Sequence, residues 1–307
     1  MSDSKHYNDY GTWIRSMFPF RVQKISINAG FSCPNRDGRI GQGGCIYCDN
    51  RTFNPAYCNS TSSIKAQLEE GKKFFSHKYP DMKFLAYFQA YTNTYESIDK
   101  LKRMYEEALG VEDVIGIVIG TRPDCVSDEL LDYLGHLNTQ TFITIEYGIE
   151  TANNNTLKLI NRGHDFECVK RIVSKTAEKG IITGGHIILG LPGEDSEEII
   201  RQAPLISALP INILKLHQLQ VIHGTKLEQM YKEHPFHLFS PDEYIELIGR
   251  YIKLLRKDIV IERFTSHSPK DMLVGPQWGM KNHEFTDKLM KYLRENNIYQ
   301  GQNVILP

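Results

Sequence analysis

Residues 33–48 read Cys33-Pro-Asn-Arg-Asp-Gly-Arg-Ile-Gly-Gln-Gly-Gly-Cys45-Ile-Tyr-Cys48 and directly follow a β-rich run at residues 24–29. Four glycines let the backbone of this stretch wrap tightly, so three thiolates on one loop can converge on one metal centre. A Cys-x-x-Cys pair is the usual bite for a tetrahedral metal or for adjacent irons of a cluster. The stretch therefore predicts a metal site held by Cys33, Cys45 and Cys48 at the end of a strand.

The count of three cysteines favours an iron–sulfur cluster over a closed site. A 4Fe-4S cluster with three cysteine ligands leaves one iron open, and an open iron can chelate the amino and carboxylate groups of S-adenosylmethionine. A structural zinc site with Cys58 as fourth ligand is the first alternative, although Cys58 has no near partner in the sequence. A redox-active Cys-x-x-Cys pair is the second. Cys125 and Cys168 are isolated.

β-rich runs alternate with helical stretches over the first two thirds of the chain. This alternation indicates repeated parallel βαβ units, which can close or partly close into a barrel with ligands at the carboxyl ends of the strands. We therefore expect an α/β fold, a partial or closed parallel (β/α) barrel of about six units. The expected strands are 24–29, 84–88, 114–119, 142–147, 186–189 and 213–219, and the expected helices are 63–77, 99–109, 127–137 and 165–179.

The pattern changes after about residue 219. A helix is expected over 241–256, a strand over 259–263, a loop over 266–279 and a last helix over 284–295. We therefore divide the chain into a barrel with the cysteine loop, residues 1–220, and a C-terminal α+β extension, residues 221–307, that covers the substrate side.

Composition narrows the class of protein. The formal charge of −1 argues against a dominant, charge-driven nucleic-acid surface. No apolar stretch is long enough to cross a membrane, and residues 1–10 lack the apolar segment of a secretory signal. A cytoplasmic location is therefore expected, with no membrane partner. In such a compartment, clustered cysteines are read as metal-binding or catalytic.

Beyond the cysteine loop, five further motifs resemble the radical S-adenosylmethionine superfamily. They are Tyr87-Phe-Gln-Ala-Tyr-Thr-Asn-Thr-Tyr95, Gly120-Thr-Arg-Pro-Asp-Cys125, Asn161-Arg-Gly-His-Asp-Phe166, Gly190-Leu-Pro-Gly-Glu194 and Leu214-Lys-Leu-His217. Within the superfamily the chain is similar to the uncharacterised bacterial YhcC-type proteins, which are related to the elongator catalytic subunit and to oxygen-independent coproporphyrinogen dehydrogenase. Eleven residues separate the first two cysteines where the commonest pattern has three, and YhcC-type and elongator-type proteins share such long spacings.

The resemblance implies roles for residues that follow the strands. Tyr47 is expected against the adenine or the cluster, or else as a loop anchor. Thr92 and Asn93 stand where the superfamily has a turn that receives the methionine amino group, although its glycines are absent here. Glu150 is expected to accept both ribose hydroxyls. The planar fork of Arg162 suits the methionine carboxylate, and the alternative for Arg162 is a surface cap of a short helix.

Two histidines complete the expected cofactor-binding set. His186 can reach the ribose or the adenine edge, or can be a satisfied core residue, and His217 ends the sixth strand on the ligand side. Arg122 and Asp124 follow the third strand and can bind each other, the cofactor or substrate. For substrate, the loop-rich part of the extension offers Arg263, His267, Lys270, Gln277 and Trp278, or these residues serve ordinary packing.

The function expected from this resemblance is reductive cleavage of S-adenosylmethionine at a 4Fe-4S cluster, giving a 5′-deoxyadenosyl radical that acts on an unknown substrate. The partners are then S-adenosylmethionine, an electron donor and a substrate that is a small molecule or RNA. One alternative is a tRNA-modifying radical enzyme of elongator type. The other is a non-catalytic structural zinc or iron–sulfur protein. The sequence leaves open the catalytic residues that act on substrate and the role of Cys58.

Overall fold

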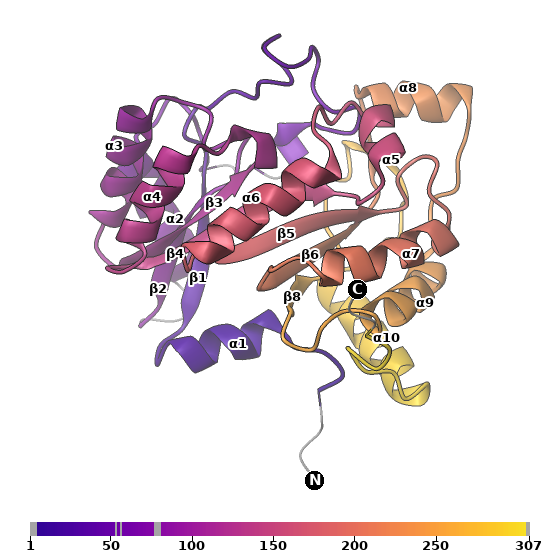
Figure 1. The fold of residues 1–307 in the computed structure, drawn as a ribbon. Coiled ribbons are helices and arrows are strands. Elements are labelled where there is room, and N and C mark those ends of the chain that lie inside the picture. The colour runs from indigo at the N-terminus through magenta and orange to yellow at the C-terminus, as the bar shows by residue number, and fades with distance from the viewer. Residues whose placement is uncertain (1–4, 53, 56, 77–80, 305–307) are drawn as a thin grey trace.

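The computed structural model describes residues 5–52, 54–55, 57–76 and 81–304. Seven parallel strands form one curled sheet in the order β1-β2-β3-β4-β5-β6-β8 (Figure 1). The expected α/β half-barrel is confirmed. Its strands are β1 (Val22–Ile27), β2 (Lys83–Phe88), β3 (Val114–Thr121), β4 (Phe142–Glu150), β5 (Ile182–Leu189), β6 (Ile213–Gln218) and β8 (Val260–Arg263).

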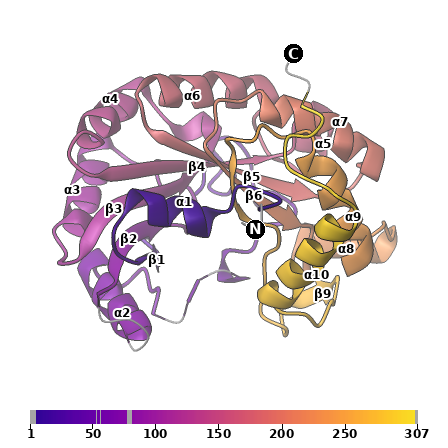
Figure 2. The same cartoon turned by 90° about the horizontal axis from the view of Figure 1, so that it is seen from below.

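Helices that connect successive strands cover the outer face of this sheet (Figure 2). Apolar residues at helical spacing dictate this packing, as in α6, where Val169, Ile172 and Val173 are buried against the sheet. The covering helices are α2 (Ile64–Ser76), α3 (Ile98–Leu109), α4 (Asp128–Leu137), α5 (Asn154–Leu159), α6 (Phe166–Glu178) and α7 (Ser196–Ser207). The helix expected over 63–77 thus appears as α2, and His77 lies outside the described residues.

Strands β1 and β8 are the two edges of the sheet, so the barrel is open between them. A side-chain ion pair spans this opening, with Lys24 Nζ of β1 lying 2.6 Å from Glu262 Oε2 of β8. Helix α1 (Tyr10–Met17), which the sequence analysis missed, lies across the lower end of the half-barrel (Figure 2). The segment before it is tied to β8, because the backbone of Ile261 donates to Asn8 O at 2.7 Å.

The C-terminal part of the chain adds α8 (Lys226–Glu233), α9 (Pro241–Ile252), α10 (Asn282–Glu295) and an antiparallel pair of β7 (Val221–Ile222) and β9 (Leu273–Gly275). Strand β9 lies inside the stretch expected to be a loop, 266–279. Strand β8 joins the main sheet beside β6, so the C-terminal part also completes the half-barrel. The division at residue 220 stays a prediction. In the described residues, no helix is long and apolar enough to cross a membrane.

The fifth strand begins at Ile182, four residues before the expected start at residue 186. The sequence did not indicate this earlier start, because Gly184 and Gly185 stand there and glycine is depleted in strands. In the structure, the two glycines leave room for side chains of the neighbouring strand β4. A Cβ atom at Gly184 would lie 3.0 Å from Cγ of Glu146, and one at Gly185 would lie 2.8 Å from Cδ1 of Ile149. The pair of glycines therefore lets β4 turn two bulky side chains toward β5.

Candidate active site

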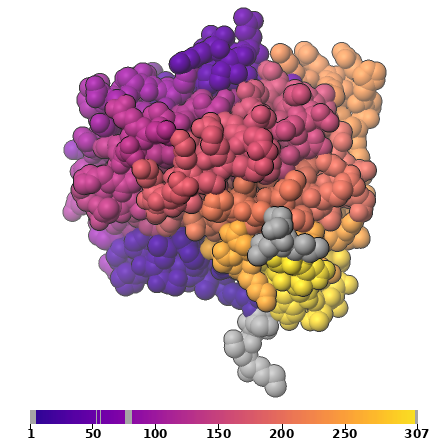
Figure 3. Space-filling model, in the orientation of Figure 1, coloured from indigo at the N-terminus to yellow at the C-terminus, as the bar shows by residue number. Residues whose placement is uncertain are grey.

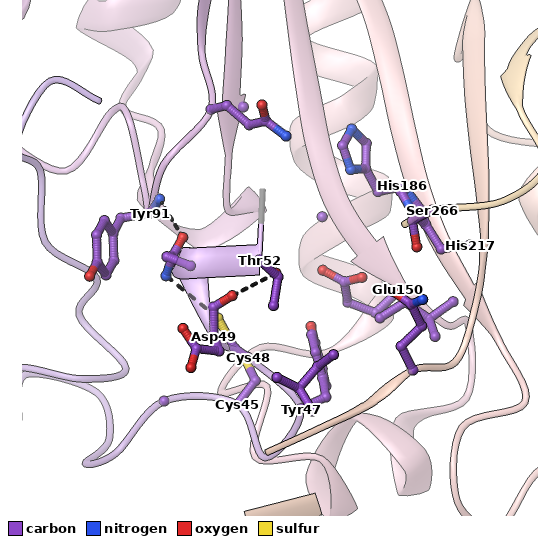
Figure 4. Close-up of a pocket in the computed structure, with 18 of the residues that line it drawn as sticks. Cys45, Tyr47, Cys48, Asp49, Thr52, Tyr91, Glu150, His186, His217 and Ser266 are labelled. Atoms are coloured by element: carbon purple, nitrogen blue, oxygen red, sulfur yellow. Dashed lines mark hydrogen bonds between the residues drawn. The ribbon is translucent and has the colours of Figure 1, made fainter. Parts of the chain in front are cut away.

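A cavity of about 290 Å³ opens at the carboxyl ends of the strands, where ligands sit in parallel α/β folds. The three loop cysteines and six of the seven predicted cofactor-binding residues line it. Figure 4 shows six of these nine residues around the cavity: Cys45, Tyr47, Cys48, Glu150, His186 and His217. Asn93 does not line it. The lining predicted residues are Cys33, Cys45, Cys48, Tyr47, Thr92, Glu150, Arg162, His186 and His217.

The cysteine loop takes its shape from left-handed glycines and from two polar side chains within it. Gly43 and Gly44 have φ of 78° and 82°, which other residues rarely adopt. Arg36 Nη2 donates to the carbonyl of Cys48 at 2.6 Å. Asn35 Nδ2 donates to Asn161 O at 2.5 Å. The loop is thereby joined to the segment that carries Arg162.

Polar donors surround two of the cysteine sulfurs. The Sγ atom of Cys45 accepts from Asn35 Nδ2 and from Arg162 Nη1, each at 3.5 Å. Asn50 Nδ2 donates to Cys48 Sγ at 3.7 Å. Such donors stabilise sulfur in its thiolate form, the form that ligates metal. Burial first, and then the sulfurs of Cys45 and Cys33, raise the pKa of the Cys48 thiol to about 11.

The loop fits an iron–sulfur cluster by its chemistry, although its thiols are not gathered as ligands. Among the described residues, no three His, Cys, Asp or Glu side chains form a ready-made metal site. Cys58 does not line the cavity, and its Sγ donates to Ser26 O at 2.8 Å. This placement disfavours the closed four-cysteine zinc site.

Glu150 is held in a strained backbone conformation at the end of β4. Its φ is 70°, and the pairing of β4 with β5 is irregular between Gly148 and Glu150. Bulges of this kind re-aim side chains beside active sites, and strained residues cluster there. Glu150 Oε1 lies 3.2 Å from Arg162 Nη2, which also donates to Gly148 O at 2.5 Å. The predicted ribose and carboxylate contacts are thus neighbours.

Arg162 is buried, and so it is not the surface cap considered as an alternative. It follows Asn161, another residue with positive φ, at 53°. Its Nε atom is buried without a hydrogen-bond partner, as is Nε2 of His217 across the cavity. Buried polar atoms are almost always paired, so these two fit a polar ligand in the cavity.

Hydrogen bonds to neighbouring segments fix the segment that follows β2. Tyr91, with φ of 65°, donates its backbone N–H to Asn50 Oδ1 at 3.0 Å. Asn93 Nδ2 donates to Gly120 O at 2.8 Å, which ties the segment to the end of β3. Thr92 lines the cavity and its backbone N–H donates to Ser32 O at 3.3 Å. Tyr47 is half-buried and also lines the cavity.

Arg122 and Asp124 bind each other in a two-pronged pair, with Nε–Oδ1 and Nη2–Oδ2 distances of 2.9 and 2.7 Å. Of the three partners that the sequence left open for these residues, namely each other, the cofactor and the substrate, the structure shows the first. Arg122 also donates from Nη2 to the carbonyl of Arg162 at 2.7 Å. The pair therefore supports the backbone that carries Arg162.

Below the cavity, a network of charged side chains fills the half-barrel. Glu146 of β4 contacts His186 Nε2 at 3.0 Å, Lys215 Nζ at 2.6 Å and Lys24 Nζ at 2.9 Å. Burial alone would raise the pKa of Glu146, but the charges of Lys215 and Lys24 outweigh it and hold that pKa well below its ordinary value. Burial lowers the pKa of Lys215 to about 8. His186 is thus anchored to a buried carboxylate.

The sequence did not point to Asn35 or Glu146 as site residues, nor to the contacts of Glu194 and Gln202 with Thr151. The Thr151 hydroxyl, next to Glu150, lies 2.5 Å from Glu194 Oε1 and 2.6 Å from Gln202 Oε1. The Gly190–Glu194 motif, read as a turn, therefore also fixes the end of β4. Glu146 could have been found, because it is a charged residue at an inward-facing position of a β-rich run.

Comparison with known proteins defines the class to which this fold and cavity belong. Residues 33–202 match the radical SAM superfamily, and residues 211–295 match its C-terminal domain. The chain belongs to the radical SAM superfamily.

Particular relatives span nearly the whole chain. YtqA of Bacillus subtilis is 34% identical over 97% of this chain and 92% of its own length. YhcC of Escherichia coli is 31% identical over 97% of this chain and 96% of its own. The structure of Elp3 from Methanocaldococcus infernus has a TM-score of 0.68 with 18% identity and covers 92% of this chain and 64% of its own, so it shares the fold.

Proposed function

We propose that this chain holds a 4Fe-4S cluster through Cys33, Cys45 and Cys48 and cleaves S-adenosylmethionine to generate a radical that acts on a substrate. One observation carries the proposal. The three thiols line the same cavity as a set of polar side chains at the strand ends, two of which, Arg162 and His217, keep buried nitrogens without partners. When bound, the cluster supplies the electron that splits S-adenosylmethionine into methionine and a 5′-deoxyadenosyl radical.

The residues of the chain bind and orient the cofactor. Arg162 receives the methionine carboxylate, because its buried fork already lies beside Cys45. Thr92, which lines the cavity, meets the amino group. Glu150 accepts the ribose hydroxyls, and its fixed backbone keeps the carboxylate pointed into the cavity. His186, oriented by Glu146, lies on the opposite wall of the cavity.

Anaerobic reconstitution with iron and sulfide tests the proposal. The reduced protein is incubated with S-adenosylmethionine, and iron, zinc and 5′-deoxyadenosine are measured. The wild type and a Cys168→Ala control, altered in helix α6 away from the cavity, should hold about four irons and form 5′-deoxyadenosine. Cys45→Ala should lose both. Stoichiometric zinc without cofactor cleavage in the wild type would overturn the proposal.

A further inference from the structure

The end of the cavity that faces away from the cysteines carries an arginine that forms no ion pair with any described residue. Arg263, the last residue of β8, lines the cavity and is half-buried. Within the described part of the chain it makes no ion pair and no hydrogen bond. The carboxylate of the preceding residue, Glu262, does not fully neutralise the charge of Arg263, because it already binds Lys24 at 2.6 Å and Lys215 at 3.3 Å.

The charges around Arg263 do not cancel. Lys24, Lys215 and Arg263 bring three positive charges, whereas Glu146 and Glu262 bring two negative ones, which leaves one positive charge. Both carboxylates form ion pairs with the lysines, and Glu146 also contacts His186. The excess charge therefore resides on Arg263, at the wall of the cavity, where a planar guanidinium suits a carboxylate or a phosphate.

Neighbouring side chains supply hydrogen-bond partners for such an anion. His217 has a buried Nε2 atom without a partner. Burial and then the charge of Arg263 hold the pKa of His217 well below its ordinary value, so the ring is neutral and can donate without adding charge. Ser266 lines the same end, held by Gln218, whose Nε2 donates to Ser266 O at 2.8 Å.

Figure 4 shows how these groups lie. His186, His217 and Ser266 gather on one side of the cavity, and Cys45 and Cys48 lie on the other. Four arginines line the cavity, and two of them are held elsewhere, Arg36 by the carbonyl of Cys48 and Arg122 by Asp124. Arg162 is committed to the cysteine side through Cys45 Sγ and Glu150. Arg263 is therefore available for a second ligand.

We infer that the end of the cavity formed by Arg263, His217 and Ser266 is a subsite for an anionic group, a carboxylate or a phosphate, of a small-molecule substrate. This inference rests on the proposed function, because it places the substrate in the same cavity as S-adenosylmethionine. Arg263 supplies the charge and the fork, and His217 supplies a hydrogen bond. A substrate held there by its anionic end presents the rest of its carbon frame toward the cysteine side.

Calorimetric titration of the full chain with inorganic phosphate and with acetate, at constant ionic strength, tests the subsite without any turnover. The wild type should bind at least one of them with a Kd on the order of 1 mM, and the better ligand identifies phosphate or carboxylate. Arg263→Gln should weaken that binding at least tenfold. Arg171→Gln, an exposed arginine of α6, should bind as the wild type does.

The same variants separate the subsite from the cofactor site. Arg263→Gln should keep its affinity for S-adenosylmethionine within twofold, and it should melt like the wild type because, among the described residues, Arg263 makes no hydrogen bond or ion pair that the change would remove. If Arg263→Gln fails to fold, Arg263→Lys replaces it and should weaken anion binding severalfold. Absence of anion binding by the wild type, unchanged binding by the variants, or loss of S-adenosylmethionine affinity in Arg263→Gln would each overturn the inference. Failure of cofactor cleavage alone would overturn the proposed function and leave the anion result standing.

Discussion

Gly148→Ala should uncouple Glu150 from Arg162 without straining the backbone. Gly148 does not have a positive φ, so alanine can adopt its conformation. The added Cβ would lie 2.5 Å from Glu150 Oε1 and closer still to Arg162 Nη2. Two heavy atoms cannot approach so closely, and therefore at least one of the two side chains must move.

The size of the effect follows from the contacts at stake. Moving Arg162 Nη2 disturbs its hydrogen bond to Gly148 O, at 2.5 Å, and its ion pair with Glu150, at 3.2 Å. Hydrogen bonds to charged groups contribute about 1.5–3 kcal/mol each, and one such contact should be lost from the cofactor site. The affinity for S-adenosylmethionine should then fall about ten- to hundredfold, since about 1.4 kcal/mol corresponds to a factor of ten.

Equilibrium dialysis of the reconstituted protein against S-adenosylmethionine measures this affinity. Gly11→Ala is the matched control, because its added Cβ would meet its nearest atom at 3.3 Å in helix α1, at the other end of the half-barrel. The control should bind like the wild type. If Gly148→Ala also binds within twofold of the wild type while remaining folded, the assignment of Glu150 and Arg162 to the cofactor is refuted.

Three further changes test the framework by urea unfolding. Glu146→Gln leaves Lys215 buried beside a neutral amide and should lower the free energy of unfolding by about 3 kcal/mol. Because folding depresses the pKa of Glu146, the wild type has this stability above the ordinary pKa of a glutamate and loses it as the pH falls below that value. The stability of the variant should therefore change less with pH on the acid side. Thr151→Val removes a buried hydroxyl and should cost about 1–3 kcal/mol. Gly116→Ala would place a Cβ 2.8 Å from Cβ of Phe142, so it should push β3 and β4 apart and lower the free energy of unfolding by at least about 2 kcal/mol. For any of the three variants, a change in this free energy of less than about 0.5 kcal/mol would contradict the contact described for it.

The sequence was sufficient for the parallel sheet and for the residues that gather at its carboxyl edge. Hydrophobic runs and contiguous motifs carry this information locally, because every strand of a parallel sheet ends on the same side. The place of Cys45, Glu150 and His217 around one cavity follows from that rule. Their binding roles stay predictions.

Features that depend on register or on strain could not be predicted. Glu146 and Lys215 lie 69 residues apart, and only the pairing of strands shows that both point into the half-barrel. The left-handed backbone of Glu150 accompanies an irregular pairing of β4 with β5, and no local sequence pattern predicts such a pairing. Helix α1 has a local signal, the N-cap Asp9 that accepts from the backbone of Thr12, but its place against the sheet depends on the bond from Ile261 to Asn8, which joins opposite ends of the chain.

The open seam between β1 and β8 has a consequence for how such a fold diversifies. In a closed barrel the aperture is set by the number of strands, so widening it requires a new strand. Here the seam is bridged by the side chains of Lys24 and Glu262. Substitutions at these two positions would change how the two edges are bridged without removing a hydrogen bond between paired strands. The separation of the two edges can therefore change in evolution through two side chains, with the cysteine loop unchanged.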